Sequence, residues 1–276
     1  MPELPEVETV RRGLNKLITN RKITAIEVRY PGIIVGPVTD FKNQLIGRQL
    51  LDVGRRAKYL LFNFDHDLTM ISHLRMEGKY QVRSSLGDFD KHVHVIFTLD
   101  DGQYLGYRDV RKFGKMQVVP TDAVLKTKSI AALGPEPLTP EFTPAALAAG
   151  LKRRKKNIKA TLLDQHVVSG LGNIYVDEVL WMAQINPNEP ANNLSEKQLA
   201  ALYPAINEEI ATAIKAGGTT IRSYVDAMGH KGKFQLSLKV YDQEGKPCVR
   251  CGQQIQKIKV AGRGTHFCPQ CQVLNQ

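Results

Sequence analysis

The sequence predicts a multi-domain α+β protein: an N-terminal β-sandwich with a leading helix, then a C-terminal helical domain and a four-cysteine zinc finger. Three observations predict this fold class. Residues 1–120 contain one amphipathic segment followed by many short strand-like runs. Prolines gather toward the end of 121–140, and helical composition follows. All four cysteines lie near the C-terminus. We therefore assign 1–120 as the first domain, 121–140 as a linker, 141–233 as the helical domain and 234–276 as a zinc-finger hairpin.

The chain begins with MPELPEVE, and this octapeptide has two interpretations. Proline and acidic residues suit the first turn of a helix, because proline has no N–H to leave unpaired and acids complement the helix dipole. With apolar residues at helical spacing, they predict an amphipathic helix from Pro5 to Ile18. The other interpretation is catalytic: if Met1 is removed, Pro2 is a secondary amine that can attack electrophilic carbon, and Glu3 can shuttle protons. The octapeptide alone favours the helix start.

The strand-like runs of the first domain are short and separated by turn residues. Asp65-His66-Asp67 and Asp100-Asp101-Gly102 are hairpin signals. Many short strands with little helix between them predict a β-sandwich, with the N-terminal helix packed on one edge or face. We expect strands at 22–28, 49–54, 59–64, 68–72, 92–99, 104–108 and 115–119.

Helical periodicity replaces the strand-like runs after the linker. Gly170-Leu171-Gly172-Asn173 precedes one helical segment, so its backbone amides and the Asn173 side chain can grip a phosphate at the helix N-terminus. A tight turn between helices, without a ligand, explains the same residues, and both interpretations can hold together. We expect helices at 144–151, 158–164, 174–183, 196–216 and 220–227.

The four cysteines form two pairs, Cys248-x2-Cys251 and Cys268-x2-Cys271, with sixteen residues between them. This spacing is typical of a zinc site in which two turns each supply two thiolates to one tetrahedral ion. Disulfides are the alternative, and a reducing cytoplasm disfavours them. Because four thiolates leave no position for water, we predict one Zn²⁺ ion with a structural role.

Basic residues exceed acidic residues by 38 to 27, which gives a formal net charge of +11. They cluster at 55–58 and 152–156. A solvated face explains one such cluster, but two clusters with a global excess favour a polyanionic partner such as nucleic acid, bound in a salt-dependent way. No apolar run is long enough to span a membrane, and the charged N-terminus is not a secretory signal. We expect a cytoplasmic protein with no membrane partner.

Six stretches carry a resemblance that runs from the first residue nearly to the last. They are Met1–Glu8 (MPELPEVE), Arg55–Leu60 (RRAKYL), His73–Gly78 (HLRMEG), Asp109–Gly114 (DVRKFG), Gly170–Glu178 (GLGNIYVDE) and Val260–Cys271. In this order they resemble the bacterial formamidopyrimidine-DNA glycosylases, also called 8-oxoguanine DNA glycosylases. The resemblance implies a helix-two-turns-helix motif between the β-sandwich and the zinc finger. It also implies that duplex DNA binds between the domains and that the lesion nucleotide is flipped out of the stack.

The resemblance further implies a base-excision repair mechanism. Pro2, freed of Met1, would attack C1′ of an oxidised purine nucleotide and form a Schiff base, with Glu3 as the general acid. β-Elimination and δ-elimination would then cut the strand, so the protein would be both a glycosylase and an AP lyase. Lys58 would assist elimination and contact DNA, although Lys58 taken alone is more typical of a surface strand. Arg263, between two glycines of the zinc hairpin, would bind DNA and act in the last elimination step.

Three residues resemble the trio that this family inserts into the duplex: Met76, Arg111 and Phe113. Apolar wedges and a guanidinium suit that role, because they replace stacking and reach the edge of the orphaned base. Without the resemblance, Met76 and Phe113 are more typical of core residues.

Further DNA contacts are expected at His92 and Arg154, through the resemblance, and at Lys159, as a candidate phosphate contact. His92 and His94 lie two apart on an expected strand, so a metal pair is conceivable, but no third ligand is visible and we expect no metal there. The segment 217–224 matches the part of the family that closes over the extruded base.

Two other functions stay open. A sister family, the endonuclease VIII-like enzymes, shares the architecture and the proline nucleophile but prefers oxidised pyrimidines. Leu4 and the trio of Met76, Arg111 and Phe113 favour the purine enzyme. A non-catalytic zinc-finger DNA-binding protein would account for the charge and the cysteines, but not for the N-terminal Pro-Glu pair or Lys58. We expect a monomer that acts on damaged double-stranded DNA in the bacterial nucleoid.

Overall fold

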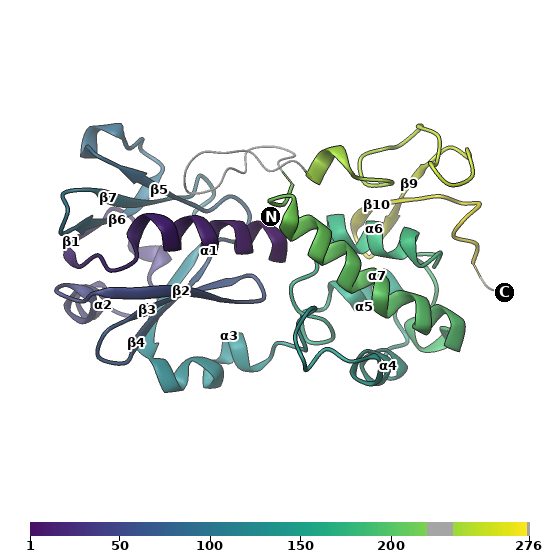
Figure 1. The fold of residues 1–276 in the computed structure, drawn as a ribbon, viewed down its shortest axis with the longest axis horizontal. Helices are drawn as coiled ribbons and strands as arrows, with labels where there is room; N and C mark the ends of the chain where they lie inside the picture. The colour runs from purple at the N-terminus through teal and green to yellow at the C-terminus, as the bar shows by residue number, and fades with distance from the viewer. Residues whose placement is uncertain (220–233, 275–276) are drawn as a thin grey trace. The chain divides into compact units, whose positions relative to one another are not determined.

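The structure is a computed structural model that describes residues 1–219 and 234–274. These residues form two compact units. The first holds 1–131 together with 217–219, and the second holds 132–216 together with 234–274. Each unit has its own set of elements, which can be followed along the chain by colour in Figure 1.

The first unit begins with the predicted amphipathic helix, α1 (Leu4–Ile18). It packs against β2 (Leu50–Arg56) and β3 (Tyr59–Phe64) (Figure 1). Val7 and Leu14, on its apolar face, are completely buried. Burial of apolar side chains of this size contributes about 1.5–3 kcal/mol each, so this face fixes the helix on the sandwich.

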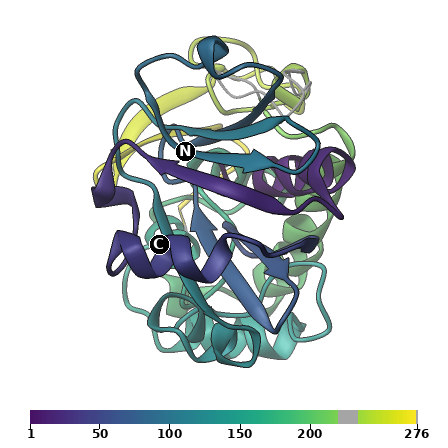
Figure 2. The same cartoon turned by 90° about the vertical axis from the view of Figure 1, so that its left-hand side faces the viewer.

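Two four-stranded antiparallel sheets form the predicted β-sandwich (Figure 2). Every strand expected in the first domain is present, and one further strand, β5 (Lys79–Arg83), is present that the sequence pattern does not indicate. The residues of β5, KYQVR, are mostly polar, so the apolar alternation that marks a strand is weak. The first sheet has the order β1 (Ile23–Val28), β6 (Val93–Leu99), β7 (Tyr104–Arg108), β5 (Lys79–Arg83), and the second has the order β2, β3, β4 (Leu68–His73), β8 (Lys115–Pro120).

Aromatic side chains form a continuous part of the core between the sheets. The ring centre of Phe62 lies 5.1 Å from that of Tyr80, and the ring centre of Tyr80 lies 5.2 Å from that of Tyr107. Tyr80 also donates a hydrogen bond from its hydroxyl to Ser72 Oγ at 2.7 Å. Both tyrosines are at most 1% exposed, so the core extends to the ends of β5 and β7, the strands that carry them.

The boundaries of the first unit differ from those expected. It continues past residue 120 because η3 (Thr121–Lys126) contacts β4 and β8. Residues 217–219, which the sequence assigns to the helical domain, group with the first unit. The expected helix at 220–227 lies outside the described residues. A short helix, α2 (Val38–Leu45), is also present although the sequence pattern does not indicate it, and it packs beside β1 and β8.

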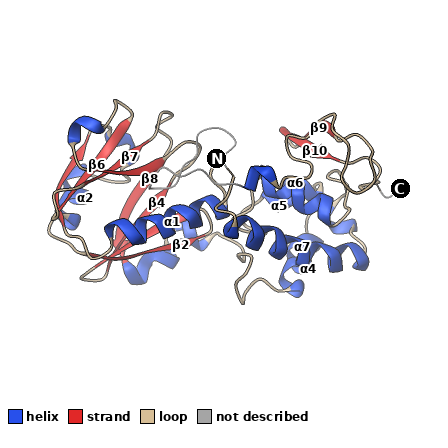
Figure 3. Cartoon of the chain, turned by 45° about the horizontal axis from the view of Figure 1, so that its top comes forward, coloured by secondary structure: helices blue, strands red, loops and turns tan. Residues whose placement is uncertain are grey.

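The second unit is helical and ends in a hairpin (Figure 3). Its main helices are α4 (Pro144–Lys152), α5 (Ile158–Leu163), α6 (Asn173–Met182) and α7 (Glu196–Lys215), and its hairpin consists of β9 (Gln256–Val260) and β10 (Arg263–Phe267). The side chains of Thr143, Asn157 and Ser195 each accept a hydrogen bond from a backbone N–H in the following helix. A cap of this kind stabilises a helix by about 1 kcal/mol. Within 1–219 and 234–274, no helix is long and apolar enough to cross a bilayer.

Candidate active site and nucleic-acid interface

The N-terminal residues of the first unit are held by the carboxylate of Glu6. Pro2 is buried and Glu3 is 3% exposed. Glu6 Oε2 accepts a hydrogen bond from the Glu3 backbone N–H at 2.8 Å, and Glu6 Oε1 accepts from the backbone N–H and the hydroxyl of Thr219 at 2.7 and 3.0 Å. Gly218 has a φ of +73°, and a Cβ there would lie 2.7 Å from Glu6 Oε1, so the position requires glycine. The sequence indicates Glu6 only as an acid at a helix start, because its partner lies 213 residues away.

Lys58 lies in the two-residue turn that joins β2 to β3, and it is 5% exposed. The interpretation of Lys58 as a surface strand residue is therefore wrong. Ala57, before it, has a φ of +51°, and its carbonyl accepts a hydrogen bond from Arg55 Nη1 at 2.9 Å. The basic cluster at 55–58 is not an exposed patch either, because the Arg55 side chain is only 13% exposed and forms an ion pair with Glu8.

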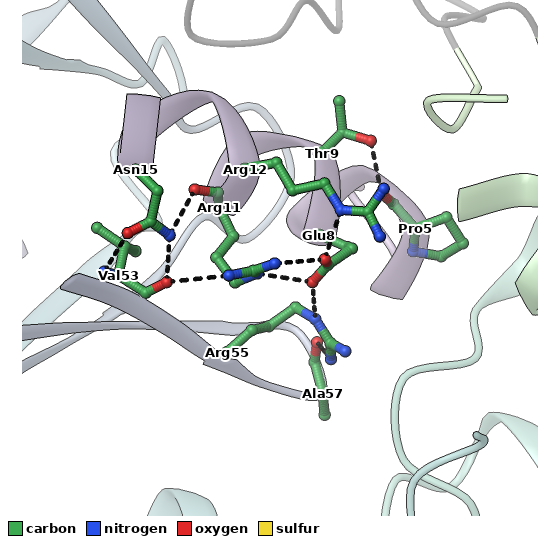
Figure 4. A network of polar contacts seen from close by, with 9 residues as sticks. All are labelled: Pro5, Glu8, Thr9, Arg11, Arg12, Asn15, Val53, Arg55 and Ala57. Atoms are coloured by element: carbon green, nitrogen blue, oxygen red, sulfur yellow. Dashed lines mark hydrogen bonds and ion pairs between the residues drawn. The ribbon is translucent and has the colours of Figure 1, made fainter. Parts of the chain in front are cut away.

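Figure 4 shows how Glu8 connects α1 to the strand that leads to Lys58. Its carboxylate accepts hydrogen bonds from Arg11 and Arg12 of the same helix at 2.8–2.9 Å and from Arg55 of β2 at 3.1 Å. Burial alone would raise the pKa of Glu8, but the hydrogen bonds from Arg11, Arg55 and Arg12 outweigh burial and lower the pKa to about 2. The ionised carboxylate therefore links α1, the helix that follows Pro2, to the strand that leads to Lys58.

A second clamp joins the same two elements. Asn15 of α1 donates from Nδ2 to the Val53 carbonyl at 2.6 Å and accepts from the Val53 N–H through Oδ1 at 2.9 Å (Figure 4). Such a paired amide contact mimics a strand neighbour and satisfies the exposed edge of β2. The position of α1 on the sheet is thus fixed at two points along its length.

His73 is a further buried group near Lys58 that the sequence analysis did not single out. It pairs with Tyr59 across β3 and β4, with ring centres 4.5 Å apart, and its Nδ1 accepts from the Arg75 N–H at 2.9 Å. Burial, together with the positive charges of Arg75 and Lys58, lowers the pKa of His73 to about 3. His73 is therefore neutral at physiological pH. Its motif, HLRMEG, contains the residue, but nothing in the sequence alone separates it from an ordinary core histidine.

Met76, Arg111 and Phe113 lie on two loops that connect strands of the sandwich. Met76 is 37% exposed and Phe113 is 49% exposed, and Arg111 is exposed as well. The interpretation of Met76 and Phe113 as core residues is therefore wrong. The Arg111 guanidinium carbon lies 4.7 Å from the centre of the Phe113 ring, which is within the range of a cation–π contact.

Asp109 and Tyr107 hold the bases of these two loops. The Asp109 carboxylate is fully buried and accepts hydrogen bonds from the Arg111 N–H at 3.1 Å, the Gly114 N–H at 2.8 Å and the Tyr107 hydroxyl at 3.4 Å. Burial, together with the Asp109 charge, raises the pKa of Tyr107 far above its ordinary value, so the hydroxyl remains a donor. A Cβ at Gly78 or Gly114 would overlap the Tyr107 hydroxyl, which explains the glycine that ends both HLRMEG and DVRKFG.

His92 lies just before β6 and is half-buried, next to the same loop. Its carbonyl accepts a hydrogen bond from the Asp109 N–H at 2.9 Å. His94 is 4% exposed, and its Nε2 lies 2.9 Å from the Asp109 carbonyl oxygen, so it supports the loop rather than a ligand. Among residues 1–219 and 234–274, the cysteines form the only group of three or more side chains placed to hold a metal, and His92 and His94 are not part of it.

In the second unit, Arg263 follows the turn of the β9–β10 hairpin and is exposed. The turn residues Ala261 and Gly262 have φ values of +50° and +75°. Two positive φ values in a two-residue loop define a type I′ turn, whose twist matches that of the strands it joins. The turn thus presents the Arg263 side chain from a regular, hydrogen-bonded hairpin.

Side chains of α5 and α6 hold this hairpin. The Gly264 carbonyl accepts hydrogen bonds from Asn173 Nδ2 at 3.0 Å and from Lys159 Nζ at 3.1 Å. Lys159 is completely buried, and its ammonium lies 2.6 Å from Asp177 Oδ1, while the other carboxylate oxygen of Asp177 accepts from the His266 N–H at 2.9 Å. The expectation that Lys159 contacts a phosphate is therefore wrong in this structure, because a buried and paired ammonium does not reach the surface. The phosphate contact of Asn173 stays a prediction.

The basic run 152–156 lies on the surface of the second unit, where four of its five residues are exposed. The Arg154 side chain is 42% exposed, and its Nη1 lies 3.6 Å from Asp164 Oδ2. An ion pair this open contributes little to stability, so Arg154 is available to a polyanion at small cost. Its contact with DNA stays a prediction.

The four cysteines converge on one point. Their sulfur atoms all lie within 4.8 Å of one another, with Cys248 Sγ 3.9 Å from Cys271 Sγ and Cys251 Sγ 3.4 Å from Cys268 Sγ. A tetrahedral ion with zinc–sulfur distances of about 2.3 Å requires sulfurs about 3.8 Å apart, so the residues fit zinc. The four thiolates hold one structural Zn²⁺ ion, which ties the two Cys-x2-Cys turns together.

Family models match the chain in three successive segments. They are the formamidopyrimidine-DNA glycosylase N-terminal domain at residues 1–116, the formamidopyrimidine-DNA glycosylase H2TH domain at 133–225, and a zinc finger found in FPG and IleRS at 245–273. These matches confirm the β-sandwich, the helix-two-turns-helix domain and the zinc finger that the sequence predicts. A chain with this architecture is a DNA glycosylase.

Relatives and solved structures give the same result over nearly the whole length. The chain is 56% identical over 274 residues to the formamidopyrimidine-DNA glycosylase of Ligilactobacillus salivarius, with 99% of both chains covered. It resembles Lactococcus lactis Fpg (MutM) in complex with N7-benzyl-Fapy-dG DNA, with a TM-score of 0.93 and 47% identity over 99% of this chain and 100% of that chain. A complex of Lactococcus lactis Fpg with abasic-site DNA has a TM-score of 0.93 and 47% identity over 98% and 99% of the two chains. The chain belongs to the formamidopyrimidine-DNA glycosylase family.

Proposed function

We propose that this chain removes oxidised purines, namely 8-oxoguanine and formamidopyrimidines, from duplex DNA and then cuts the strand by β,δ-elimination. It acts as a monomer in the bacterial cytoplasm, and Pro2 is the nucleophile of both activities. The observation that carries the proposal is the arrangement at the N-terminus: Pro2 and Glu3 are buried, Glu6 fixes the Glu3 backbone, and Glu8 links their helix to the turn that carries Lys58.

The chemistry requires that Met1 be removed, because the peptide bond to Met1 delocalises the lone pair of the Pro2 nitrogen. Pro2 N then forms a bond to C1′ of the flipped nucleotide while the bond from C1′ to the base breaks, and the base leaves with the amine proton. Glu3 gives a proton to O4′ as the sugar ring opens, and an iminium between Pro2 and C1′ results. Loss of the C2′ proton expels the 3′ phosphate, and a second elimination expels the 5′ phosphate. Lys58 assists the first elimination and Arg263 the last.

The exposed trio of Met76, Arg111 and Phe113 supports binding to a duplex with one nucleotide flipped out. Exposed apolar side chains of this size on neighbouring loops suit insertion into a base stack, and the Arg111 guanidinium suits a hydrogen bond to the edge of the orphaned base. His92, Arg154 and Asn173 contact the phosphates in this proposal, which predicts strong salt dependence of binding. The complex of the Lactococcus lactis relative with a formamidopyrimidine lesion agrees with this substrate class, and its complex with an abasic site agrees with binding to damaged DNA.

Borohydride trapping tests the proposal, because borohydride reduces an iminium to a stable amine. The substrate is a duplex with 8-oxoguanine opposite cytosine, and removal of Met1 is verified by intact mass. We expect a covalent protein–DNA adduct from the Met1-free protein and none from a matched preparation that retains Met1. If the Met1-free protein binds the duplex without forming an adduct, the proposed Schiff base on Pro2 is wrong.

The endonuclease VIII-like alternative is separated by a second duplex. Excision rates are compared on 8-oxoguanine opposite cytosine and on thymine glycol opposite adenine, with the same protein preparation. We expect faster excision of the oxidised purine. Faster excision of thymine glycol would favour the pyrimidine enzyme, with the same nucleophile.

A further inference from the structure

Trp181 is the only tryptophan of the chain, and it lies on the last turn of α6 beside the zinc-binding cysteines. It is 7% exposed and packs in one apolar cluster with Val240, Ile255 and Cys248. Its indole nitrogen, Nε1, lies 3.4 Å from Cys248 Sγ with the geometry of a donated hydrogen bond. An indole N–H can only donate, and a buried one needs an acceptor. The acceptor here is a ligand of the metal.

Arg250 fixes the orientation of the indole from the other side. It lies between Cys248 and Cys251 in the first cysteine turn, and its guanidinium carbon is 4.2 Å from the centre of the Trp181 ring. The same guanidinium donates to the Trp181 carbonyl at 2.9 Å and to the Met182 carbonyl at 3.4 Å, at the C-terminal end of α6. A cation at this end of a helix satisfies carbonyls that have no partner in the helix. The first cysteine turn is therefore docked on the end of α6 by contacts that hold the indole in place.

The chemistry of a four-thiolate site makes such a donor useful. One Zn²⁺ ion with four thiolates carries a net formal charge of about −2, and this charge is buried in part. Hydrogen bonds to the sulfurs spread the charge and orient the ligands. A donor of this kind within the finger is the Cys271 N–H, which lies 3.4 Å from Cys268 Sγ. Trp181 adds one from outside the finger.

We propose that Trp181 is a positioning residue of the zinc site, whose indole N–H donates to the Cys248 thiolate and thereby slows the loss of zinc. The residue does not ligate the metal. It acts through Cys248, and it couples the metal site to α6, the helix whose first residue, Asn173, binds the hairpin of Arg263. Zinc retention can be measured without DNA, so this proposal and the proposed function fail independently.

Replacement of the indole N–H by sulfur tests the hydrogen bond directly. Because Trp181 is the only tryptophan, growth of a tryptophan auxotroph on β-(3-benzothienyl)alanine changes this position alone and keeps the bicyclic ring. Zinc transfer to a chromogenic chelator is timed for this protein, for wild type and for Trp181→Phe. We expect transfer to be about tenfold faster from the benzothienyl protein, which corresponds to about 1.4 kcal/mol. Transfer from Trp181→Phe should be at least as fast.

A spectroscopic measurement separates the hydrogen bond from packing. With Co²⁺ in place of zinc, the sulfur-to-cobalt charge-transfer bands depend on the electron density of the thiolates, so loss of a donor to Cys248 should shift them to lower energy. Circular dichroism checks that the benzothienyl protein is folded. Unchanged bands and unchanged zinc transfer in the benzothienyl protein would overturn the proposal. If only Trp181→Phe releases zinc faster, the ring acts by packing, and the proposal is also wrong.

Discussion

Replacement of Glu8 by glutamine tests the link between α1, the helix that follows Pro2 and Glu3, and the sheet. Glu8 is 7% exposed and accepts charge-assisted hydrogen bonds from Arg11, Arg12 and Arg55 at 2.8–3.1 Å. Folding lowers its pKa from 4.5 to about 2. At about 1.4 kcal/mol per pKa unit, this difference contributes about 3 kcal/mol to stability. The pKa is lower in the folded state, so the contribution is complete above about pH 4.5 and is lost as the pH falls toward about 2.

The assay is urea unfolding at pH 7 and at pH 3, with two probes. Near-ultraviolet circular dichroism of the tyrosines follows unfolding of the first unit, which contains Tyr80 and Tyr107. Trp181 fluorescence follows unfolding of the second unit. We expect Glu8→Gln to lower the free energy of unfolding of the first unit by about 3 kcal/mol at pH 7 and by about 1.4 kcal/mol at pH 3, with the Trp181 transition unchanged. The matched control is Glu27→Gln, whose side chain is 51% exposed and pairs with Arg29, and it should cost less than about 1 kcal/mol. A Glu8→Gln effect no larger than that of the control, or equal at both pH values, would refute the reasoning.

Three further outcomes follow from the buried contacts. Gly114→Ala should place a Cβ against the Tyr107 hydroxyl and destabilise the first unit by about 1–3 kcal/mol. The control is Gly87→Ala, where the new Cβ would lie 3.6 Å from its nearest neighbour and should have almost no effect. Equal melting temperatures of the two variants in calorimetry would contradict the overlap. His73 should remain neutral from about pH 5 to 8, because its pKa is about 3; an imidazole proton resonance of His73 that titrates near pH 6.5 in NMR would show the opposite. Because folding lowers the pKa of His73, the free energy of unfolding should decrease as the pH falls below the unfolded-state pKa of about 6.5. Lys159→Met should lower the free energy of unfolding of the second unit by about 3–5 kcal/mol, because Asp177 stays buried without its ammonium partner. The control is Lys156→Met, at an exposed lysine, which should have little effect. Urea unfolding followed by Trp181 fluorescence compares the two variants, and equal effects would exclude a buried ion pair.

The architecture could be predicted because local patterns carry it. Alternating apolar residues marked most strands of the sandwich, helical spacing marked α1, and the cysteine spacing marked the zinc site. β5 could not be predicted because Lys79, Gln81 and Arg83 leave little apolar alternation in its sequence. Residues 121–131 of the expected linker group with the first unit, because η3 contacts β4 and β8, and a linear pattern does not contain such contacts.

The site could be predicted only in part. The octapeptide itself offered Pro2 and Glu3 as one of two interpretations, and the resemblance favoured the catalytic one. Lys58 and the exposure of Met76 and Phe113 came from the resemblance alone, since composition places Met and Phe in a core. Contacts between residues far apart in the sequence were beyond a linear pattern. Glu6 accepts hydrogen bonds from Thr219, so from the sequence it is only an acid at a helix start. Lys159 donates to Asp177 and Gly264, whereas the sequence predicts a phosphate contact for it.

The identity of the attacking atom is tested most directly by mapping the trapped adduct. Met1-free protein is reduced with borohydride on the 8-oxoguanine duplex, the DNA and protein are digested, and the modified peptide is sequenced by tandem mass spectrometry. We predict that the sugar remnant is attached to the nitrogen of Pro2 and to no lysine. Attachment to Lys58, or to any other side chain, would contradict the account.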